Sequence, residues 1–504
     1  MKNSIAKNTI VLSGAGILIK FMGVMYKLPI IKLLGQKGLG MYSAIYPVFA
    51  IFLVISTSAL PLGISRYISK NSSDDGMSNA FMTSIIIGLI ASIIIFSFSK
   101  IISNVQGNSD YKIIYFLISP TVFVTFIMGA LRGYFQGKQD MKTVAISQII
   151  EQFFKILFGI IIAWLLLGFG TIYGVTGLFS GIALSECITT FYLVKNYKKH
   201  QKINIKFKHI NVIKILKIVL PISIVATLLP LSETITSIII FPLIKYFSLD
   251  LKVKMFGMTS GIVQSIINVP LIISSSLATV LLPAVSSAKK DYDYKKDINS
   301  CLKVIFTVSV FFSVMFFIFS DEMSYFLTDN LHMDIKKEVL SNLFKFGGIT
   351  IFYSSMLQIL NSVMQGIGLG YKSAICMLSG IIFKIICLII LSQQKNVNLY
   401  SIFIAQSMGS GISVLCELLF LKKHISLNNN GIVFLSQLVF TETLFILSAV
   451  LLKKTFDITL VTTIIKFVFA TFVYIATLLL INYSYIIAIL KRFTLRKKIP
   501  QITM

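Results

Sequence analysis

Stretches of about 20 or more mostly apolar residues recur along the whole chain, and they constrain its fold more than any other feature. A helix that crosses a bilayer needs about 20 such residues. Only 13% of the 504 residues are charged, about half the share of a soluble domain. We therefore predict an all-α polytopic membrane protein with about fourteen transmembrane helices. The predicted spans are 5–34, 40–65, 79–99, 113–131, 143–167, 172–194, 218–244, 256–288, 301–320, 343–366, 373–392, 399–421, 431–452 and 461–490.

Basic residues indicate how these spans are oriented. The net charge is +27, and Lys and Arg gather in segments that lie inside the cell when the N-terminus is cytoplasmic. The strongest of these segments is 195–217, which holds eight lysines, and residues 491–498 agree with it. We therefore expect a multi-pass protein of the cell membrane with both termini in the cytoplasm. Its basic segments would meet anionic lipid headgroups rather than nucleic acid.

The chain also repeats itself. Residues 131–137 match 360–366 at a shift of 229, and Phe154-Lys155-Ile156 matches Phe383-Lys384-Ile385 in the same register. Each half holds six predicted spans, so we expect two parallel six-helix repeats related by an axis along the membrane normal, followed by two C-terminal helices. The predicted parts are an N-lobe over 1–200, a C-lobe over 201–425, and two extra helices with a basic tail over 426–504.

Charges inside the spans are the first candidates for a functional site, because a charge at the bilayer centre costs about 2.5–3.5 kcal/mol. Lys20 lies deep in the first span, and Lys27 follows seven residues later on the same helix face. Lys155 and Lys384 lie near the middle of the fifth and eleventh spans. Glu151 stands four residues before Lys155, so a self-neutralised pair within one helix is an open alternative to a substrate contact there.

Cations that line a cavity suit an anionic cargo, and a pyrophosphate is the natural anion of a lipid carrier. Membrane anchoring remains an alternative for the arginines, and helix packing for the glutamine. The spacing of Cys and His predicts no metal site, and no cofactor or catalytic residue is expected. We predict substrate contacts at Lys20, Lys27, Arg66, Arg132, Gln136, Lys155 and Lys384, and charge partners or gating groups at Glu151, Glu186 and Glu233.

Three stretches of the sequence carry a more specific pattern. They are Lys20…Gly23…Tyr26-Lys27-Leu28-Pro29, Arg132-Gly133-Tyr134-Phe135-Gln136-Gly137…Glu151…Lys155, and Asn268-Val269-Pro270…Leu282-Pro283-Ala284. These stretches resemble the stage V sporulation protein B family of polysaccharide biosynthesis flippases. That family is related to lipid II flippases within the multidrug/oligosaccharidyl-lipid/polysaccharide exporter superfamily. The resemblance implies fourteen helices in two lobes, alternating access to a cationic cavity, and a groove for a polyprenyl tail formed by the extra helix pair.

By the same resemblance, Lys20, Lys27, Arg132, Glu151 and Lys155 are the positions of greatest interest. The chain departs from the family where Lys27 and Lys155 replace an expected Arg. A lysine keeps the positive charge but loses the bidentate geometry of a guanidinium. These departures leave the identity of the substrate open.

The leading hypothesis is a flippase for a polyprenyl-pyrophosphate-linked saccharide, such as lipid II or a related cell-wall or spore-cortex precursor. Its partners would be this cargo, membrane lipid and a coupling ion. The alternatives are a cation-coupled antiporter of the multidrug type and a non-transporting scaffold for wall or spore assembly. We do not expect an enzyme, because the acids of 321–345, the longest outer loop predicted, are interpreted as a solvated rim.

Overall fold

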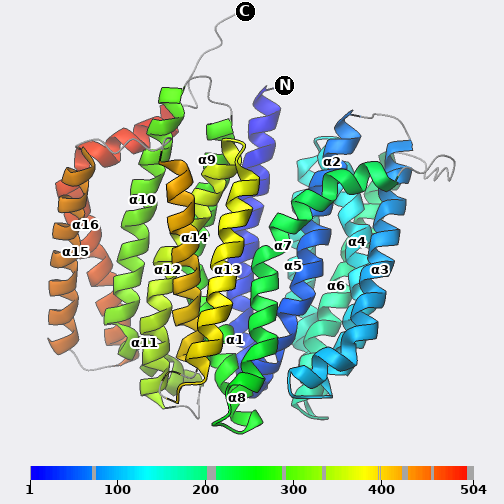
Figure 1. Ribbon diagram of the computed structural model, residues 1–504, viewed down its shortest axis with the longest axis horizontal. Helices are drawn as coiled ribbons and strands as arrows, with labels where there is room; N and C mark the ends of the chain where they lie inside the picture. The colour runs from blue at the N-terminus through cyan, green and yellow to red at the C-terminus, as the bar shows by residue number, and fades with distance from the viewer. Residues whose placement is uncertain are drawn as a thin grey trace, which may run out of the picture. The chain divides into compact units, whose positions relative to one another are not determined.

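The computed structural model describes the backbone of residues 2–70, 75–200, 212–286, 291–331, 336–395, 397, 399–422, 430–455 and 459–495. Over these residues the chain forms helices and turns, with no strand. Figure 1 shows the helices, coloured along the chain from blue at the N-terminus to red at the C-terminus. They are α1 (Lys2–Val54), the π-helical turn η1 (Ile55–Ala59), α2 (Leu60–Lys70), α3 (Asp75–Val105), α4 (Tyr111–Gly137), α5 (Met141–Leu167), α6 (Thr171–His200), α7 (Val212–Leu243), α8 (Leu249–Phe256), the π-helical turn η2 (Gly257–Val263), α9 (Gln264–Ser286), α10 (Asp291–Ile318), α11 (Ser320–Leu331), α12 (Lys337–Gly366), α13 (Gly370–Ser392), α14 (Tyr400–Leu421), α15 (Asn430–Thr455) and α16 (Leu460–Leu495).

The helix α1 contains a sharp break at Gly35, where φ is 63° and ψ is −170°. Glycine is essentially the only residue that adopts this conformation. The apolar stretch Phe21–Ser69 around the break is 49 residues long. At 1.5 Å per residue it measures about 74 Å, more than twice the roughly 30 Å of the hydrocarbon core. It therefore crosses twice, and with the other twelve candidate spans of the described residues the predicted fourteen helices are confirmed.

The chain packs as two compact units. Unit 1 contains Met1–Ile272 and Met377–Ala405. Within it, α1 packs against α5, α6, α7 and α8, and α6 packs against α4 and α5. The division into lobes at residues 200 and 425 stays a prediction.

Small residues let α5 and α6 approach closely. A Cβ atom on Gly181 would lie 2.2 Å from the backbone nitrogen of Gly159, and one on Gly177 would lie 2.6 Å from backbone atoms of Ala163. Such small-residue contacts are typical of membrane helices that pack backbone to backbone. Because the two helices are antiparallel, residues one turn before Gly159 and one turn after Gly181 lie at the same level, which sets the place of the candidate site.

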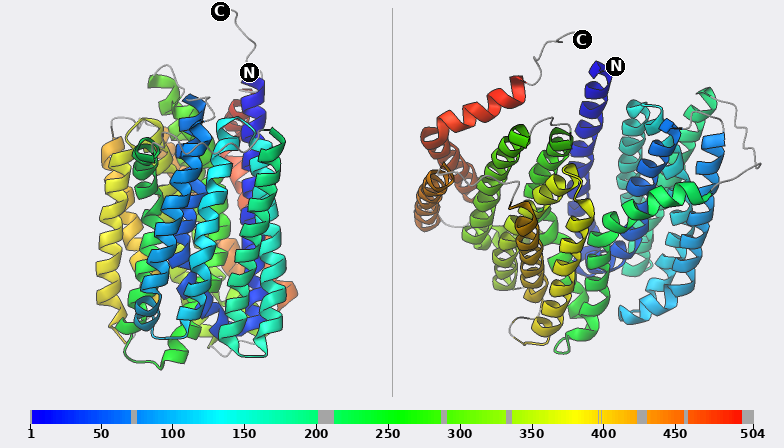
Figure 2. Two further views of the ribbon diagram at one scale, coloured as in Figure 1. Left: turned by 90° about the vertical axis from the view of Figure 1, so that its right-hand side faces the viewer. Right: turned by 45° about the horizontal axis from the view of Figure 1, so that its top comes forward.

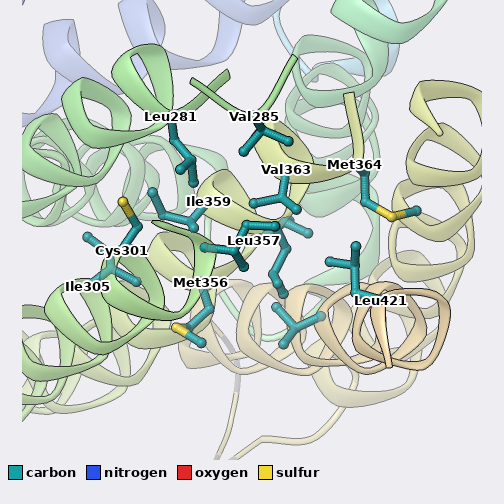
Figure 3. Close-up of a cluster of buried hydrophobic side chains, with 13 residues drawn as sticks. Leu281, Val285, Cys301, Ile305, Met356, Leu357, Ile359, Val363, Met364 and Leu421 are labelled. Carbon is teal, nitrogen blue, oxygen red and sulfur yellow. The ribbon is translucent and has the colours of Figure 1, made fainter. Parts of the chain in front are cut away.

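Unit 2 contains Ile273–Cys376 and Gln406–Met504. Its core is a cluster of buried side chains from α9, α10, α12 and α14, shown in Figure 3. The helices α15 and α16, which follow the repeats, lie side by side, and α15 packs against α10. Within the described side chains, α16 provides the span Val461–Leu480, and the last part of this helix runs at an angle to its first part (Figure 2).

The structure confirms the register of the internal repeat. The helix α4 ends at Gly137 and α12 at Gly366, and in both halves the next helix begins four residues later. Between them, Gln139 and Gly368 have φ angles of 63° and 83°. In both turns, the amide of the following residue donates a hydrogen bond of 2.8 Å to the carbonyl five residues back. Each of these pairs is separated by the shift of 229 found in the sequence.

The interpretation of the acids of 321–345 as a solvated rim is wrong for Glu322, whereas Glu338 is exposed and Asp334 lies outside the described residues. Residues Ser320–Leu331 form α11, and Glu322 is fully buried, with one carboxylate oxygen 3.5 Å from the Lys466 ammonium of α16. Acidic residues in the first turn favour a helix, because they complement its dipole. The buried lysine on α16, which the sequence analysis did not consider, explains why Glu322 faces inward.

The neighbouring Asp321 joins α11 to α15. Its carboxylate accepts hydrogen bonds from the Lys453 ammonium at 2.6 Å and the Ser341 hydroxyl at 2.5 Å. Burial acts to raise the pKa of Asp321, but these two hydrogen bonds outweigh burial and hold the pKa below its usual range. The first turn of α11 therefore ties both extra helices to unit 2.

Candidate functional site

Unit 1 brings together several of the residues singled out in the sequence. The guanidinium of Arg132, on α4, donates a hydrogen bond of 2.7 Å to Glu151 Oε2 and another of 2.9 Å, from Nε, to the Ser147 hydroxyl. Arg132 is 1% exposed. Both partners lie on α5, four residues apart on one helix face. Arg132 thus fixes α4 against α5.

Lys155 lies one turn beyond Glu151 on α5. Its ammonium lies 5.2 Å from the centre of the Tyr46 ring, a cation–π contact. It also interacts electrostatically with Glu151 and with Glu186 on α6. The Glu151 carboxylate is therefore shared between two cations. Lys155 is its i,i+4 neighbour, and Arg132 holds it at salt-bridge distance.

Lys27 is half-buried on α1, the same helix that carries Tyr46. Its ammonium donates a hydrogen bond of 3.4 Å to the Gly261 carbonyl, which belongs to the π-helical turn η2. Lys27 and Lys155 also repel each other electrostatically. Two ammonium groups from α1 and α5 therefore act on the same region of unit 1.

Lys384, on α13, lies in a second polar contact of unit 1. It is 4% exposed, and its ammonium lies 3.1 Å from Glu233 Oε1 and 3.1 Å from the Ser232 hydroxyl, both on α7. Glu233 is half-exposed, with 50% of its side chain accessible. Lys384, expected as a substrate contact, and Glu233, expected as a charge partner or gating group, thus form an ion pair with each other.

Two predicted residues with described side chains, Arg66 and Gln136, are not joined to these contacts. The Lys20 side chain lies outside the described part of the structure. Arg66 is exposed on α2, and Gln136 is half-buried in the last turn of α4. Among the described side chains, no hydrogen bond or ion pair links Arg66 or Gln136 to Lys27, Lys155 or Arg132. Their predicted contact with a substrate stays a prediction.

Sequence reasoning missed several partners. Ser147 could have been found, because it stands four residues before Glu151 on one helix face. Lys466 could have been found as a charge inside the last predicted span. Tyr46 and the Gly261 carbonyl gave no signal, since a ring beside a distant lysine and a π-helical turn both depend on tertiary packing. Among the described residues, no group of three metal-ligating side chains is present.

Comparisons with known proteins fit this architecture. A family model described as polysaccharide biosynthesis protein matches residues 5–289. Stage V sporulation protein B of Bacillus subtilis (strain 168) is 23% identical over 423 residues, 79% of this chain and 80% of the relative. Lipid II flippase MurJ of the same organism is 21% identical over 471 residues, which cover 84% of each protein. The resemblance stated from the motifs is confirmed.

Solved structures share the fold at low identity. A structure of lipid II flippase MurJ in an inward closed conformation has a TM-score of 0.74 at 16% identity, and the match covers 95% of this chain and 100% of that chain. An inward-facing multidrug resistance MATE family transporter of the MOP superfamily has a TM-score of 0.66 at 15% identity, with 80% and 94% covered. The all-α, many-span fold predicted from hydropathy is thus confirmed.

Hydropathy, the repeat and the motifs lead to one architecture, and the family match covers more than half of the chain. The chain is a multi-pass membrane protein of the flippase and transporter type, and it belongs to the polysaccharide biosynthesis protein family.

Proposed function

We propose that this protein is a flippase that translocates a polyprenyl-pyrophosphate-linked saccharide across the bilayer by alternating access. The cargo would be lipid II or a related precursor of the cell wall or spore cortex. Membrane lipid would hold the polyprenyl tail, and a coupling ion would be the remaining partner. Such a function requires binding and conformational change but no catalytic residue, so it fits the expectation of a non-enzymatic protein.

The observation that carries this proposal is the pair of lysines in unit 1. Neither Lys27 nor Lys155 lies within salt-bridge distance of a carboxylate in the described part of the chain. Each has instead a weaker partner, a carbonyl or an aromatic ring. A lysine inside a span costs about 2.5–3.5 kcal/mol, and an anion that bound both would recover part of this cost through charge-assisted hydrogen bonds. A diphosphate has the charge and the spread of oxygens to do so.

Arg132 has a different part in this proposal. Its guanidinium is buried and already bonded to Glu151 and Ser147, so we propose that it positions α5 and Lys155 rather than contacting cargo. Lys20, on the Lys27 face of α1, and the exposed Arg66 are proposed as further cationic contacts, and Gln136 as a hydrogen-bond donor. Lys384 and Glu233 are proposed as a gating pair.

The relatives support the class of cargo. One is named for flipping lipid II, and another for sporulation. A multidrug antiporter is the second candidate, because the fold is shared with MATE transporters. The charges of unit 1 favour the first candidate, since the ammonium groups of Lys27 and Lys155 would repel a drug cation. Glu151 and Glu233 are each bonded to a basic side chain, and the buried Glu186 lies within the electrostatic reach of Arg132 and Lys155.

The test is translocation of labelled lipid II in proteoliposomes by the wild type and by Lys155→Ala. The loss of a hydrogen bond to a charged group, about 1.5–3 kcal/mol, corresponds to a rate at least about tenfold lower. Lys142→Ala is the matched control, because Lys142 lies on the same helix but is exposed at its first turn. Lys155→Arg keeps the charge and should retain most of the activity.

Equal rates for Lys155→Ala and wild type would remove Lys155 from the binding site. If the wild type moves no lipid II but moves another polyprenyl-pyrophosphate saccharide, the class of cargo stands and its glycan changes. Function in cells that survives replacement of Lys27 and Lys155, with normal delivery to the membrane, would favour a scaffold.

A further inference from the structure

Glu151 and Glu233 each form a salt bridge with a basic side chain, whereas Glu186 is buried and one of its carboxylate oxygens accepts no hydrogen bond among the described residues. The residue is 1% exposed, and its Oε2 atom accepts no hydrogen bond within the described residues. A buried carboxylate of this kind is costly when it is charged. It therefore requires either nearby cations or a proton.

The groups around Glu186 come from every helix that packs against α6. Three of them interact with Glu186 electrostatically. Of the two tyrosines on α1, Tyr46 contacts Lys155 and Tyr42 contacts Phe179 of α6. The charged and titratable groups are Arg132 on α4, Glu151 and Lys155 on α5, Tyr42 and Tyr46 on α1, and Cys187 on α6 itself.

Four charges of this cluster balance one another, and Lys27, which acts on Lys155 from α1, adds a further positive charge beside them. Arg132 and Lys155 supply two positive charges, and Glu151 and Glu186 supply two negative ones. Two cations act on Glu186 electrostatically, first Arg132 and then Lys155. Arg132 is shared, because Glu151 holds it at 2.7 Å, whereas Lys155 forms no salt bridge among the described residues. Lys155 is also the group that the proposed function assigns to the anionic cargo.

An anion that binds Lys155 therefore takes one of the two cations that act on Glu186 and leaves it only Arg132, which Glu151 already holds. A buried carboxylate that loses counter-charge is costlier to keep ionised, and such a group takes up a proton instead. We propose that Glu186 is a proton-binding site linked to the cargo site, so that a diphosphate and one proton bind together and leave together. The proton adds to Oε2 from water when the anion arrives and returns to water when it departs.

This inference rests on the proposed function, and it makes a separate prediction. By linkage, if cargo promotes protonation of Glu186, then protonation strengthens cargo binding by the same factor. The affinity for a diphosphate-linked cargo should fall as the pH rises, by at most about tenfold per pH unit, the limit for one linked proton.

The experiment measures the affinity of the full-length protein in detergent micelles for fluorescent lipid II, from about pH 5 to about pH 9. The wild type should lose affinity as the pH rises, whereas Glu186→Gln, which mimics the protonated acid, should show a flat profile. In weakly buffered solution, a pH indicator should register proton uptake when lipid II is added to the wild type.

Glu417→Gln is the matched control. Glu417 is a buried glutamate of unit 2, on α14, where Ser373 donates a hydrogen bond of 2.8 Å to Oε1 and Oε2 has no hydrogen bond. No basic side chain of the described part of unit 2 pairs with it. With no cation to lose, Glu417 should not respond to an anion, so its variant should keep the wild-type pH profile.

The outcomes separate the two proposals. Binding of lipid II with a flat wild-type profile and no proton uptake would overturn the role of Glu186 and leave the proposed function standing. No binding at any pH would contradict the proposed cargo, and the proton site with it. A wild-type pH profile that persists in Glu186→Gln assigns the proton to another group. If Glu186→Gln does not fold, the absence of proton uptake by the wild type still overturns the proposal, and loss of uptake in Glu417→Gln assigns the proton to Glu417 instead.

Discussion

At the scale of single residues, the most constrained group of unit 1 is the Arg132 guanidinium. It is buried between α4 and α5, and both of its named partners lie on one face of α5. A buried ion pair contributes little net stability compared with apolar residues, yet the loss of one partner is expensive because the other charge stays buried. The effects on stability of replacing Arg132 and Glu151 should therefore be coupled.

We predict that Glu151→Ala lowers the free energy of unfolding by about 3 kcal/mol, the lower end of the range for a buried pair, because the Glu151 side chain is 17% exposed. Glu151→Gln should lose less, since its amide oxygen still accepts a hydrogen bond. The double variant Arg132→Met with Glu151→Leu should recover much of the loss. Thermal unfolding in detergent micelles measures all three, and an additive double variant would show that the pair is not coupled.

The pairing of Arg132 with Glu151 could not be deduced from the sequence. The spacing of Glu151 and Lys155 suggested a local pair, and the structure adds a competitor from another helix at 2.7 Å. Burial of a charge can be predicted from its place in an apolar run, but the choice of partner depends on which helix faces cross. For the same reason, the contacts of Lys27 with the Gly261 carbonyl and of Lys155 with Tyr46 could not be predicted from the sequence.

At the scale of helices, the sequence is far more informative. Apolar run lengths predicted the spans, and the shift of 229 predicted that α4 and α5 correspond to α12 and α13, which end and begin at matching residues. The helix α11 was not predicted, because its twelve residues include Asp321, Glu322 and Asp329 and do not form an apolar run. Its inward-facing acid became intelligible only with the buried Lys466 of α16 beside it.

The matching turns between these helices give a test at the same scale. Gly368 has a φ of 83° with open space where a Cβ would stand, so Gly368→Ala should cost about 1 kcal/mol through backbone strain alone. Gln139 occupies the equivalent place with a φ of 63°, and Gln139→Gly should relieve a similar strain. Because glycine also raises the entropy of the unfolded chain, Gln139→Gly should raise the free energy of unfolding by less than about 1 kcal/mol.

The control for this pair is Gly370→Ala, two residues beyond Gly368 at the first position of α13. A Cβ there would make only an ordinary contact, at 3.7 Å from Gln365, and alanine favours a helix. Thermal unfolding in micelles should rank Gly370→Ala above Gly368→Ala. Equal stability of the two variants would mean that the turn adapts its backbone.

At the scale of the whole molecule, the fold follows from the pattern of apolar segments rather than from particular side chains. Solved transporters share it at 15–16% identity, so this fold tolerates the replacement of most side chains. Helices satisfy the backbone polar groups within the bilayer, and small residues let them pack closely. The charged residues carry different information from the apolar segments. Those within spans mark the candidate site, and those between spans predict which way the molecule faces.

The predicted orientation can be tested directly. With eight lysines, 195–217 should stay in the cytoplasm. Three predicted spans separate this segment from the turn after α3, and each span crosses the membrane once. The turn after α3 should therefore face outward. In a variant without the five native cysteines, Ser109→Cys should react with a membrane-impermeant thiol reagent in intact cells. Lys199→Cys, at the end of α6, should react only after the cells are made permeable. The opposite labelling would invert the molecule, and the basic segments would then act as headgroup contacts on the outer surface.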